Sequence, residues 1–265
     1  MVEDFFRIRQ EKPLIQQITN FVVQNETANM TLCVGALPVM VWEIEEVAEM
    51  VTHAGALLFN VGNITWADSM IVAGKKANEL GIPVILDPVG AGATKPRTDA
   101  IKRIISEVKI DIIRGNSAEI GILAGAGGKI KGVEAVGESE GILDAACDYA
   151  KREGFVVSVT GSEDIVTDGK RTALVKNGHP IMAMVTGTGC MSTTVTAAFA
   201  AVQRDYFRAA VGALVVYGIA GEKAAAEAGN RPGTFHTLLY DSIYGLTRED
   251  IMGGAKVGFP VSSRA

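Results

Sequence analysis

Hydrophobic residues along this chain follow two alternating patterns. Short, mostly apolar runs bounded by glycine, proline or polar residues indicate buried β-strands, and longer stretches with an apolar residue every three or four positions predict amphipathic α-helices. Strands are predicted at residues 14–19, 56–60, 83–87, 111–114, 155–160, 165–167, 172–176 and 180–184. Helices are predicted at residues 25–34, 43–52, 67–80, 99–108, 117–124, 140–152 and 193–202, and the chain beyond them is nearly all helical.

The alternation of strands and helices predicts one α/β domain. Continuous apolar strands separated by amphipathic helices are typical of a mainly parallel sheet that helices cover on both faces. Asp168-Gly169, between two short strands, predicts a single hairpin. No linker rich in proline or serine, no charge run and no repeat divides the sequence, so residues 1–265 are interpreted as a single domain.

Composition narrows the class of protein. Hydrophobic residues make up 48% and charged residues 21%, which permits a large core and excludes global disorder. The formal net charge of −5 argues against nucleic acid or an anionic membrane as a partner. Residues 1–9 mix acidic and basic side chains, unlike a signal peptide. The apolar stretch at residues 209–221 is rich in glycine and shorter than the ~20 residues that a membrane span needs.

The cysteines are three in number and widely spaced. Cys33 and Cys147 fall on predicted helices and are interpreted as core residues, whereas Cys190 lies outside any apolar pattern. The spacing fits free thiols in a reducing compartment and contains no zinc motif. We therefore expect a cytoplasmic protein.

A glycine-rich turn, VTGTGC at residues 185–190, separates a predicted strand from a predicted helix. Glycine lets the backbone approach a ligand closely, and the first amides of a helix point outward at the positive end of its dipole, so this turn can bind a phosphate or an oxyanion. A helix N-terminus can also lower a thiol pKa from ~8.5 toward neutrality, which would make Cys190 a base. An ordinary strand-to-helix turn with a buried cysteine explains the same residues equally well.

Polar residues or glycines follow nearly every predicted strand, where the ligands of parallel sheets bind. These residues are Thr19, Asn20, Asn60, Gly62, Asp87, Arg114, Asn116, Glu119, Thr160 and Gly161. Each alone is explained by a turn or a helix cap. Together they combine two carboxylates, an arginine and threonines with a glycine-rich helix start, which suits phosphoryl transfer. No P-loop or complete dinucleotide-binding fingerprint accompanies them.

Five segments carry a family resemblance: QITN at residues 17–20, ALPVM at 36–40, DPVG at 87–90, RGNSAE at 114–119 and VTGTGC at 185–190. In this order they resemble the hydroxyethylthiazole kinases of the ribokinase-like superfamily. The resemblance implies a three-layer α/β sandwich with a mainly parallel central sheet and no lid domain. It also implies a homotrimer with active sites between neighbouring subunits. The implied reaction transfers the ATP γ-phosphate to the hydroxyl of 4-methyl-5-(2-hydroxyethyl)thiazole, in thiamine biosynthesis or salvage.

The resemblance assigns catalytic roles to the glycine-rich turn. Cys190 takes the place of the base that activates the alcohol, where relatives elsewhere in the superfamily usually have aspartate. Gly187, Thr188 and Gly189 form, with Cys190, the anion hole for the transferred phosphoryl group.

Metal, nucleotide and acceptor contacts are also implied by the resemblance. Asp87 and Glu119 organise Mg²⁺, directly or through water, since Mg²⁺ takes few direct protein ligands. The ATP-binding residues are Arg114, Thr160 and Asp87. The residues that contact the thiazole are Met40, Gly187, Asn20 and Gly62. Asn116 is expected to support the turn of Glu119 and not to touch substrate.

Three other functions fit the same residues. A related kinase would act on another small alcohol, such as a pyrimidine methanol or a pyridoxal. A dehydratase on the same fold would use ADP or ATP to repair a hydrated nicotinamide cofactor, and it would not need an activated alcohol. A regulator that binds nucleotide without catalysis would keep the fold, although it would have no need of both Asp87 and Glu119.

Overall fold

One sheet runs through the whole molecule. The computed structural model describes residues 1–126 and 138–260, which form a nine-stranded sheet in the order β2-β1-β3-β4-β5-β6-β7-β8-β9. Neighbours from β2 to β6 run parallel, and neighbours from β6 to β9 run antiparallel. The strands are β1 Leu14–Ile18, β2 Leu37–Val39, β3 Ala56–Asn60, β4 Val84–Asp87, β5 Ile112–Asn116, β6 Val156–Thr160, β7 Asp164–Thr167, β8 Thr172–Val175 and β9 Val257–Gly258.

Helices cover both faces of this sheet. The α-helices are α1 Val2–Glu11, α2 Gln24–Val34, α3 Val47–Val51, α4 Ala67–Leu80, α5 Lys95–Glu107, α6 Ser117–Ala124, α7 Glu138–Glu153, α8 Thr188–Val202, α9 Tyr206–Ala228, α10 Pro232–Tyr244 and α11 Arg248–Gly254. Short 3₁₀ helices occupy η1 Ile64–Trp66 and η2 Pro180–Met184.

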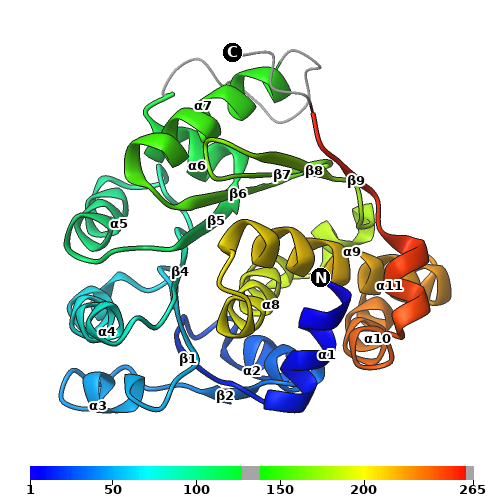
Figure 1. Cartoon of the computed structure of the whole chain (residues 1–265), viewed down its shortest axis with the longest axis horizontal. Helices are drawn as coiled ribbons and strands as arrows, with labels where there is room; N and C mark the ends of the chain where they lie inside the picture. The colour runs from blue at the N-terminus through cyan, green and yellow to red at the C-terminus, as the bar shows by residue number, and fades with distance from the viewer. Residues whose placement is uncertain (127–137, 261–265) are drawn as a thin grey trace.

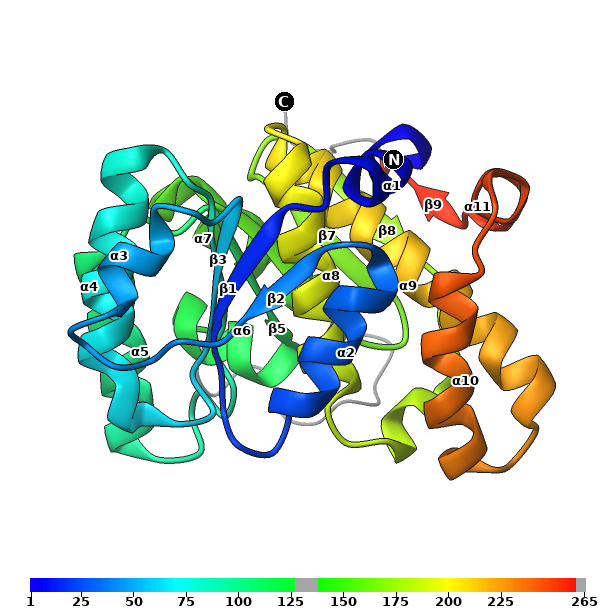
Figure 2. The ribbon, with the colours of Figure 1, turned by 90° about the horizontal axis from the view of Figure 1, so that it is seen from below.

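The helices and the sheet form three layers (Figures 1 and 2). Helices α3 to α7 lie on one face, and α1, α2 and α8 to α11 lie on the other. Each helical layer packs its own apolar core against the sheet. The predicted three-layer α/β sandwich is therefore confirmed. Every strand in the described ranges belongs to the one sheet, so none of them builds a lid.

The strand register aligns the carboxyl ends of the parallel strands. Asn60, the last residue of β3, pairs with Asp87, the last residue of β4. In the same way Asn116 at the end of β5 pairs with Thr160 at the end of β6. The polar residues predicted after successive strands therefore meet at one edge of the sheet, where parallel sheets bind ligands.

The strand predicted at residues 180–184 is wrong, because this segment forms η2. Pro180 has no amide hydrogen for a sheet ladder. The His179 side chain instead accepts a hydrogen bond from the Ile181 amide at 3.2 Å, which begins the 3₁₀ turn. Only Ile181 of the segment is buried. The apolar run therefore lies across the surface and does not enter the sheet.

Helix α1 and strands β2 and β9 were not predicted. Strand β2 has three residues and contains Pro38, which an edge strand tolerates because its outer side needs no ladder partner. Strand β9 has two residues and pairs with β8 at the other edge. Strands this short carry too few residues to show a hydrophobic period. The predicted hairpin is confirmed, since β7 and β8 pair antiparallel on either side of Asp168-Gly169.

Helix α9 corrects the expectation for the apolar stretch at residues 209–221. The helix extends over 23 residues and, alone among the helices of the described ranges, is long and apolar enough to cross a membrane. Within the fold, however, 83% of its apolar window is buried. Its hydrophobicity is accounted for by its central position in the second helical layer, against α8 and α10 (Figure 1).

Candidate active site

The glycine-rich turn opens helix α8 earlier than the sequence pattern predicts. The helix begins at Thr188, so Cys190 lies in its first turn. Gly187 precedes it with φ of 90°, in the left-handed region that favours glycine. The Thr188 hydroxyl hydrogen bonds to the carbonyls of Met182 (3.0 Å) and Val185 (3.2 Å). The turn is thereby tied to η2, and the Thr193 side chain of α8 reaches Asp87 at the end of β4.

Arg114 lies against the beginning of α8. Its guanidinium donates a hydrogen bond to Thr160 Oγ1 at 2.6 Å, and only 8% of the residue is exposed. A Cβ atom placed on Gly189 would lie 2.9 Å from Arg114 Nη1. Within the described residues, the buried Nε atom of Arg114 has no hydrogen-bond partner. A buried cation thus lies beside a helix N-terminus, and both features favour the binding of an anion.

Asp87 is the centre of a chain of hydrogen-bonded side chains. Asn20, in the loop after β1, donates to Asn60 Oδ1 at 2.7 Å. Asn60 donates to Asp87 Oδ2 at 3.3 Å, and Thr193 of α8 donates to the same oxygen at 2.8 Å. The chain joins three strand ends to α8 and fixes the carboxylate at their meeting point.

Gly62 belongs to the same corner. Its amide donates to Asn60 Oδ1 at 3.2 Å, and a Cβ atom on Gly62 would lie 2.4 Å from Asn20 Nδ2. The structure therefore brings together the predicted site residues Asn20, Gly62 and Asp87. It also includes Asn60, which the sequence placed at a strand end without a specific role, and Thr193, which the sequence did not single out.

Burial controls the protonation of Asp87. The residue is 2% exposed, and burial raises the pKa of its carboxyl to about 6, although the positive charge of Arg114 acts in the opposite direction. The negative charge of Glu119 raises the pKa further. A buried carboxylate that a neighbouring carboxylate repels would be stabilised by a bound cation.

The thiol of Cys190 differs from the expectation for a helix N-terminus. Burial raises its pKa to about 12, and the negative charge of Asp87 adds to the effect. Asn60 and Arg114 act in the opposite direction but do not offset the burial. The expected stabilisation of the thiolate is therefore wrong, and Cys190 is a neutral thiol near pH 7.

Glu119 uses both carboxylate oxygens to hold backbone. Oε1 accepts a hydrogen bond from the Gly90 amide at 2.8 Å, and Oε2 accepts one from the Asn116 amide at 2.9 Å. Asn116 Oδ1 in turn accepts from the Glu119 amide at 2.9 Å, which completes a capping box at the start of α6. The expectation that Asn116 supports Glu119 is confirmed. Glu119 also links α6 to the turn after Asp87.

The positive charge of Arg114 also acts on a second carboxyl group, that of the half-buried Asp164. Asp164, at the start of β7, accepts a hydrogen bond from the Gly161 amide at 2.9 Å. Burial raises the pKa of its carboxyl to about 6, and the positive charge of Arg114 lowers it. Sequence reasoning missed this residue, because an acidic side chain just after a turn is common and carries no distinct signal.

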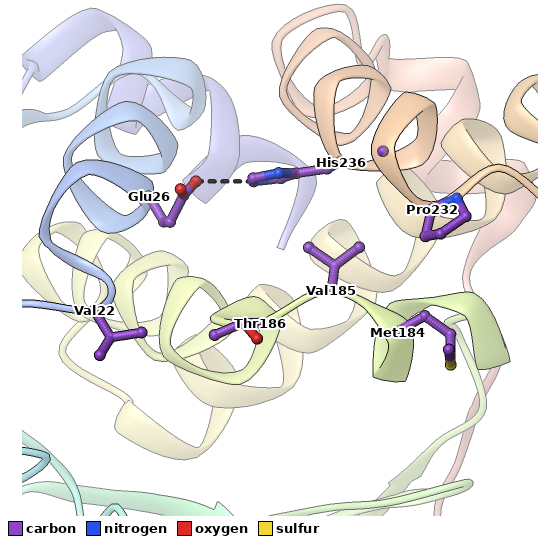
Figure 3. A pocket seen from close by; sticks show the side chains of 8 residues that line it. Val22, Glu26, Met184, Val185, Thr186, Pro232 and His236 are labelled. Atoms are coloured by element: carbon purple, nitrogen blue, oxygen red, sulfur yellow. Dashed lines mark hydrogen bonds and ion pairs between the residues drawn. The ribbon is translucent and has the colours of Figure 1, made fainter.

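A pocket of about 370 Å³ lies beside Val185 and Thr186, which directly precede Gly187 (Figure 3). It is lined by Val22, Glu26, Met184, Val185, Thr186, Pro232, Gly233 and His236. Gly187 reaches its wall, since a Cβ atom there would lie 3.1 Å from Val23 Cγ1 and 3.8 Å from Glu26 Cβ. Met40 is not among the lining residues. It follows β2 at the edge of the sheet and is half-buried.

Comparison with known proteins places this geometry in a family. The Hydroxyethylthiazole kinase family matches residues 5–249. A hydroxyethylthiazole kinase from Roseiflexus castenholzii is 53% identical over 253 residues, which cover 95% of this chain and 93% of the relative. The structure of the hydroxyethylthiazole kinase protein from Pyrococcus horikoshii OT3 superposes with a TM-score of 0.90 at 43% identity and covers 98% of each chain.

A more distant neighbour shows the fold alone. The pyridoxal kinase from Staphylococcus aureus, in complex with AMP-PCP and pyridoxal, has a TM-score of 0.60 at 14% identity and covers 79% of this chain and 88% of its own. The predicted ribokinase-like architecture is thereby confirmed. Because the family match and the identity above half extend over nearly the whole sequence, the chain belongs to the hydroxyethylthiazole kinase family.

Proposed function

We propose that this protein transfers the γ-phosphoryl group of ATP to the hydroxyl of 4-methyl-5-(2-hydroxyethyl)thiazole, in thiamine biosynthesis or salvage. The observation that carries the proposal is the meeting of the buried Arg114 guanidinium with the first turn of α8 at Gly189. Phosphoryl transfer depends on charge neutralisation and positioning, and this corner supplies both. The family of the chain and the adjoining pocket support the acceptor.

The experiment compares three acceptors under one set of conditions. Purified protein is incubated with ATP and Mg²⁺ plus the thiazole alcohol, plus a hydrated nicotinamide cofactor, or with neither. We expect the phosphorylated thiazole, detected by mass spectrometry, and ATP consumption in the first mixture alone. ATP consumption only with the hydrated cofactor would show that the protein is a dehydratase and not a kinase. Equal ATP consumption in all three mixtures, including the one without an acceptor, would contradict both the kinase and the dehydratase.

We propose that the transferred phosphoryl group lies on the amides of Gly187, Thr188 and Gly189, with Arg114 and Thr160 contacting the nucleotide phosphates. Arg114 can neutralise charge that develops on the phosphoryl oxygens, since its guanidinium is always protonated. The Thr160 hydroxyl holds the guanidinium toward the turn. A dry, preorganised site makes such donors more effective than they would be in water.

Asp87 and Glu119 are the residues proposed to hold Mg²⁺. The described residues contain no group of three or more His, Cys, Asp or Glu able to bind a metal by themselves. Mg²⁺ suits such a place, because it keeps several waters and completes its shell with substrate phosphates. Asp87 accepts its hydrogen bonds from side chains, whereas Glu119 holds two backbone amides and would act through water. Bound Mg²⁺ supplies positive charge opposite the phosphates.

Cys190 is proposed to contact the acceptor hydroxyl. It occupies the first turn of α8 beside Asp87 and Asn60, and both residues influence its pKa. A neutral thiol orients a hydroxyl but removes its proton poorly. The loose transition state usual for phosphoryl transfer needs little assistance from a base. How much base catalysis Cys190 supplies is tested by the last prediction below.

We also propose a homotrimer, with Met40, Asn20, Gly62 and Gly187 around the acceptor and with Met40 supplied by a neighbouring subunit. Large apolar side chains are exposed on the loops and on the edge strand, where a subunit contact would cover them. They are Phe21, Val22, Leu37, Ile44 and Met184. The outer side of β2 has no partner strand within the described ranges.

Mixed assemblies test this arrangement. Chains that carry Met40→Asp and chains that carry Gly189→Val are expected to be inactive alone and to regain activity after they are mixed and reassembled. Recovery follows because some interfaces then combine an intact Met40 with an intact turn. Native mass spectrometry gives the number of subunits. A monomeric mass, or two inactive variants that stay inactive when mixed, would contradict the shared site.

A single domain over residues 1–265 and a cytoplasmic location remain part of the proposal. One continuous sheet through the described residues supports the single domain. Three free cysteines support a reducing compartment. Cell fractionation with an antibody against the native chain checks the location.

A further inference from the structure

Glu26, His236 and Tyr240 form a hydrogen-bonded cluster at the pocket beside Gly187. His236 Nε2 lies 2.8 Å from Glu26 Oε2 and 3.2 Å from the Tyr240 hydroxyl. The Tyr240 hydroxyl donates to the same Glu26 oxygen. Figure 3 shows Glu26 from α2 and His236 from α10 pointing toward one another across the pocket. The side chains are partly exposed, at 26% for Glu26 and 31% for His236, so a ligand can reach them.

The remaining walls of the pocket are mainly apolar. Val22, Met184, Val185 and Pro232 supply them, and Thr186 is the one other polar side chain among the lining residues. A pocket of about 370 Å³ with apolar walls and a few polar groups is typical of a small-molecule site. Such walls suit a flat, apolar ring. A ring placed there needs a polar partner wherever it carries a nitrogen.

The hydrogen bonds of the cluster leave one ring nitrogen of His236 available. Glu26 Oε2 accepts from the Tyr240 hydroxyl, whose pKa is raised by burial and by Glu26, so the phenol keeps its proton. The ring proton directed at Glu26 is then carried by His236 Nε2. Nδ1 has no hydrogen-bond partner within the described residues. It donates when the imidazole is protonated and accepts when it is neutral.

The pocket also adjoins the glycine-rich turn that is proposed to bind the phosphoryl group. The aliphatic part of Glu26 lies against Gly187, and Val185 and Thr186 line the pocket directly before that glycine. A ring seated beside His236 would therefore have the beginning of α8 next to it. The side chain of such a ring would extend past Thr186 and Gly187 toward the first turn of α8, which contains Cys190.

We propose that His236 determines acceptor specificity by hydrogen bonding, through Nδ1, to the ring nitrogen of a heteroaromatic alcohol. Glu26 and Tyr240 are positioning residues that fix the orientation of the imidazole. The proposal rests on the proposed function, because the acceptor is taken to be the substrate of the same turn. It explains why a charged cluster stands in an otherwise apolar pocket.

The variant His236→Gln separates this role from that of a clamp between α2 and α10. A glutamine amide nitrogen can take the place of Nε2 and keep the hydrogen bond to Glu26, but it has no counterpart of Nδ1. The matched variant His236→Asn keeps a polar group near Nδ1 and loses the bond to Glu26. We expect His236→Gln to retain the melting temperature and to raise the Kd of the thiazole alcohol about tenfold, the value of one neutral hydrogen bond. The Kd of ATP should not change.

Calorimetry with two ligands completes the test, since binding can be measured without turnover. The second ligand is the thiophene analogue, in which CH replaces the ring nitrogen of the thiazole. Wild-type protein should bind the thiazole about tenfold more tightly than the thiophene, and His236→Gln should bind both equally. Should His236→Gln fold poorly, His236→Asn is expected to keep part of the preference for thiazole at a lower melting temperature.

Two results would overturn the assignment of His236. One is equal affinity of the wild type for thiazole and thiophene, and the other is an undiminished preference in His236→Gln. A lower melting temperature in His236→Gln with unchanged affinities would leave the cluster as a clamp only. Failure of the proposed function looks different: no phosphorylated product would form with ATP, although calorimetry would still record the preference for the ring nitrogen.

Discussion

The two sides of the Gly187 turn differ in burial and in the hydrogen bonds that hold their side chains. On the side of the sheet, Asp87 is 2% exposed and Arg114 8% exposed, and hydrogen bonds join side chains from several elements. On the side of the pocket, Val22 and Met184 are each 71% exposed. The phosphoryl-transfer side is thus fixed within one chain, whereas the acceptor side is open.

The physical reason lies in burial. Polar groups removed from water must find partners, and a fully partnered network has little freedom. The open side has no such requirement, and its apolar side chains can adjust to a ligand or to another subunit. Substitutions on the sheet side should therefore lower kcat or change folding stability, and substitutions on the pocket side should mainly change KM.

The largest loss is expected for Gly189→Val. The new Cβ atom would lie 2.9 Å from Arg114 Nη1, and the two methyl groups would cover the amides that are proposed to bind the phosphoryl group. We expect kcat to fall at least ~10³-fold, more than the loss of one anion-hole donor. Steady-state kinetics measure the loss, and circular dichroism checks the fold.

A matched control comes from Gly141 of α7. No atom lies within 4 Å of a Cβ atom built there. Gly141→Val places the same side chain in a helix far from the turn and should keep wild-type kcat. Normal turnover in Gly189→Val would contradict the proposal that the phosphoryl group binds at this turn.

The second prediction concerns Asp87→Asn. Asparagine keeps an oxygen for the Thr193 hydroxyl and the Asn60 amide, so the fold should survive. Loss of the carboxylate removes the proposed Mg²⁺ contact. We expect kcat to fall by roughly 10³-fold, because a metal supplies several kcal/mol of charge stabilisation and each ~1.4 kcal/mol is tenfold. Activity is titrated against Mg²⁺, and an unchanged Mg²⁺ requirement would contradict the role.

Much of the sheet side could be predicted from sequence, because each residue there occupies the end of a strand that is itself recognisable. The buried runs at β3, β4 and β5 locate Asn60, Asp87 and Arg114. Thr193 could not be assigned in this way. Three threonines lie close together on α8, and the packing of that helix decides which of them faces Asp87.

On the pocket side, the sequence singled out the glycine-rich turn but not the cluster opposite it. Glu26 and His236 are 210 positions apart, and no periodicity connects α2 to α10. The pKa of Cys190 also escaped prediction. A sequence shows that a thiol stands at a helix N-terminus, but burial and the neighbouring Asp87 raise the pKa more than the helix lowers it.

A third prediction tests whether the ionised carboxylate of Asp164 lowers the folding stability. The pKa of Asp164 is raised from an ordinary 3.8 to about 6, so the folded protein binds its proton more tightly than the unfolded chain does. This contribution to stability is complete below pH 3.8 and is lost as the pH rises through about 6. At pH 8 the buried carboxylate is therefore destabilising.

Asp164→Asn should remove this penalty. Asparagine Oδ1 can still accept the Gly161 amide. A shift of about two units corresponds to about 3 kcal/mol, and since the residue keeps some exposure we expect a gain of about 1–2 kcal/mol at pH 8. Urea unfolding at pH 4 and pH 8 measures it, and the difference between the two proteins should be larger at pH 8. An equal difference at both pH values would show that the carboxyl group does not titrate in this range.

The smallest effect on the sheet side is expected for Cys190→Ala. Its pKa of about 12 leaves about one molecule in 10⁴ as thiolate at pH 8, so a thiolate base would act rarely. We expect kcat to fall about tenfold, below the ~10²–10⁴-fold usual for general-base catalysis, through lost orientation of the hydroxyl.

The pH dependence of kcat distinguishes orientation from proton removal. If the thiolate were the base in the rate-limiting step, wild-type kcat would rise tenfold per pH unit between pH 7 and pH 9, because the thiolate fraction does so below the pKa. Cys190→Ala would lose that slope. With orientation alone, the two profiles run parallel and differ by a constant factor. A slope present only in the wild type would restore Cys190 as the base. It would also mean that turnover at this preorganised site depends on the rare thiolate form of Cys190.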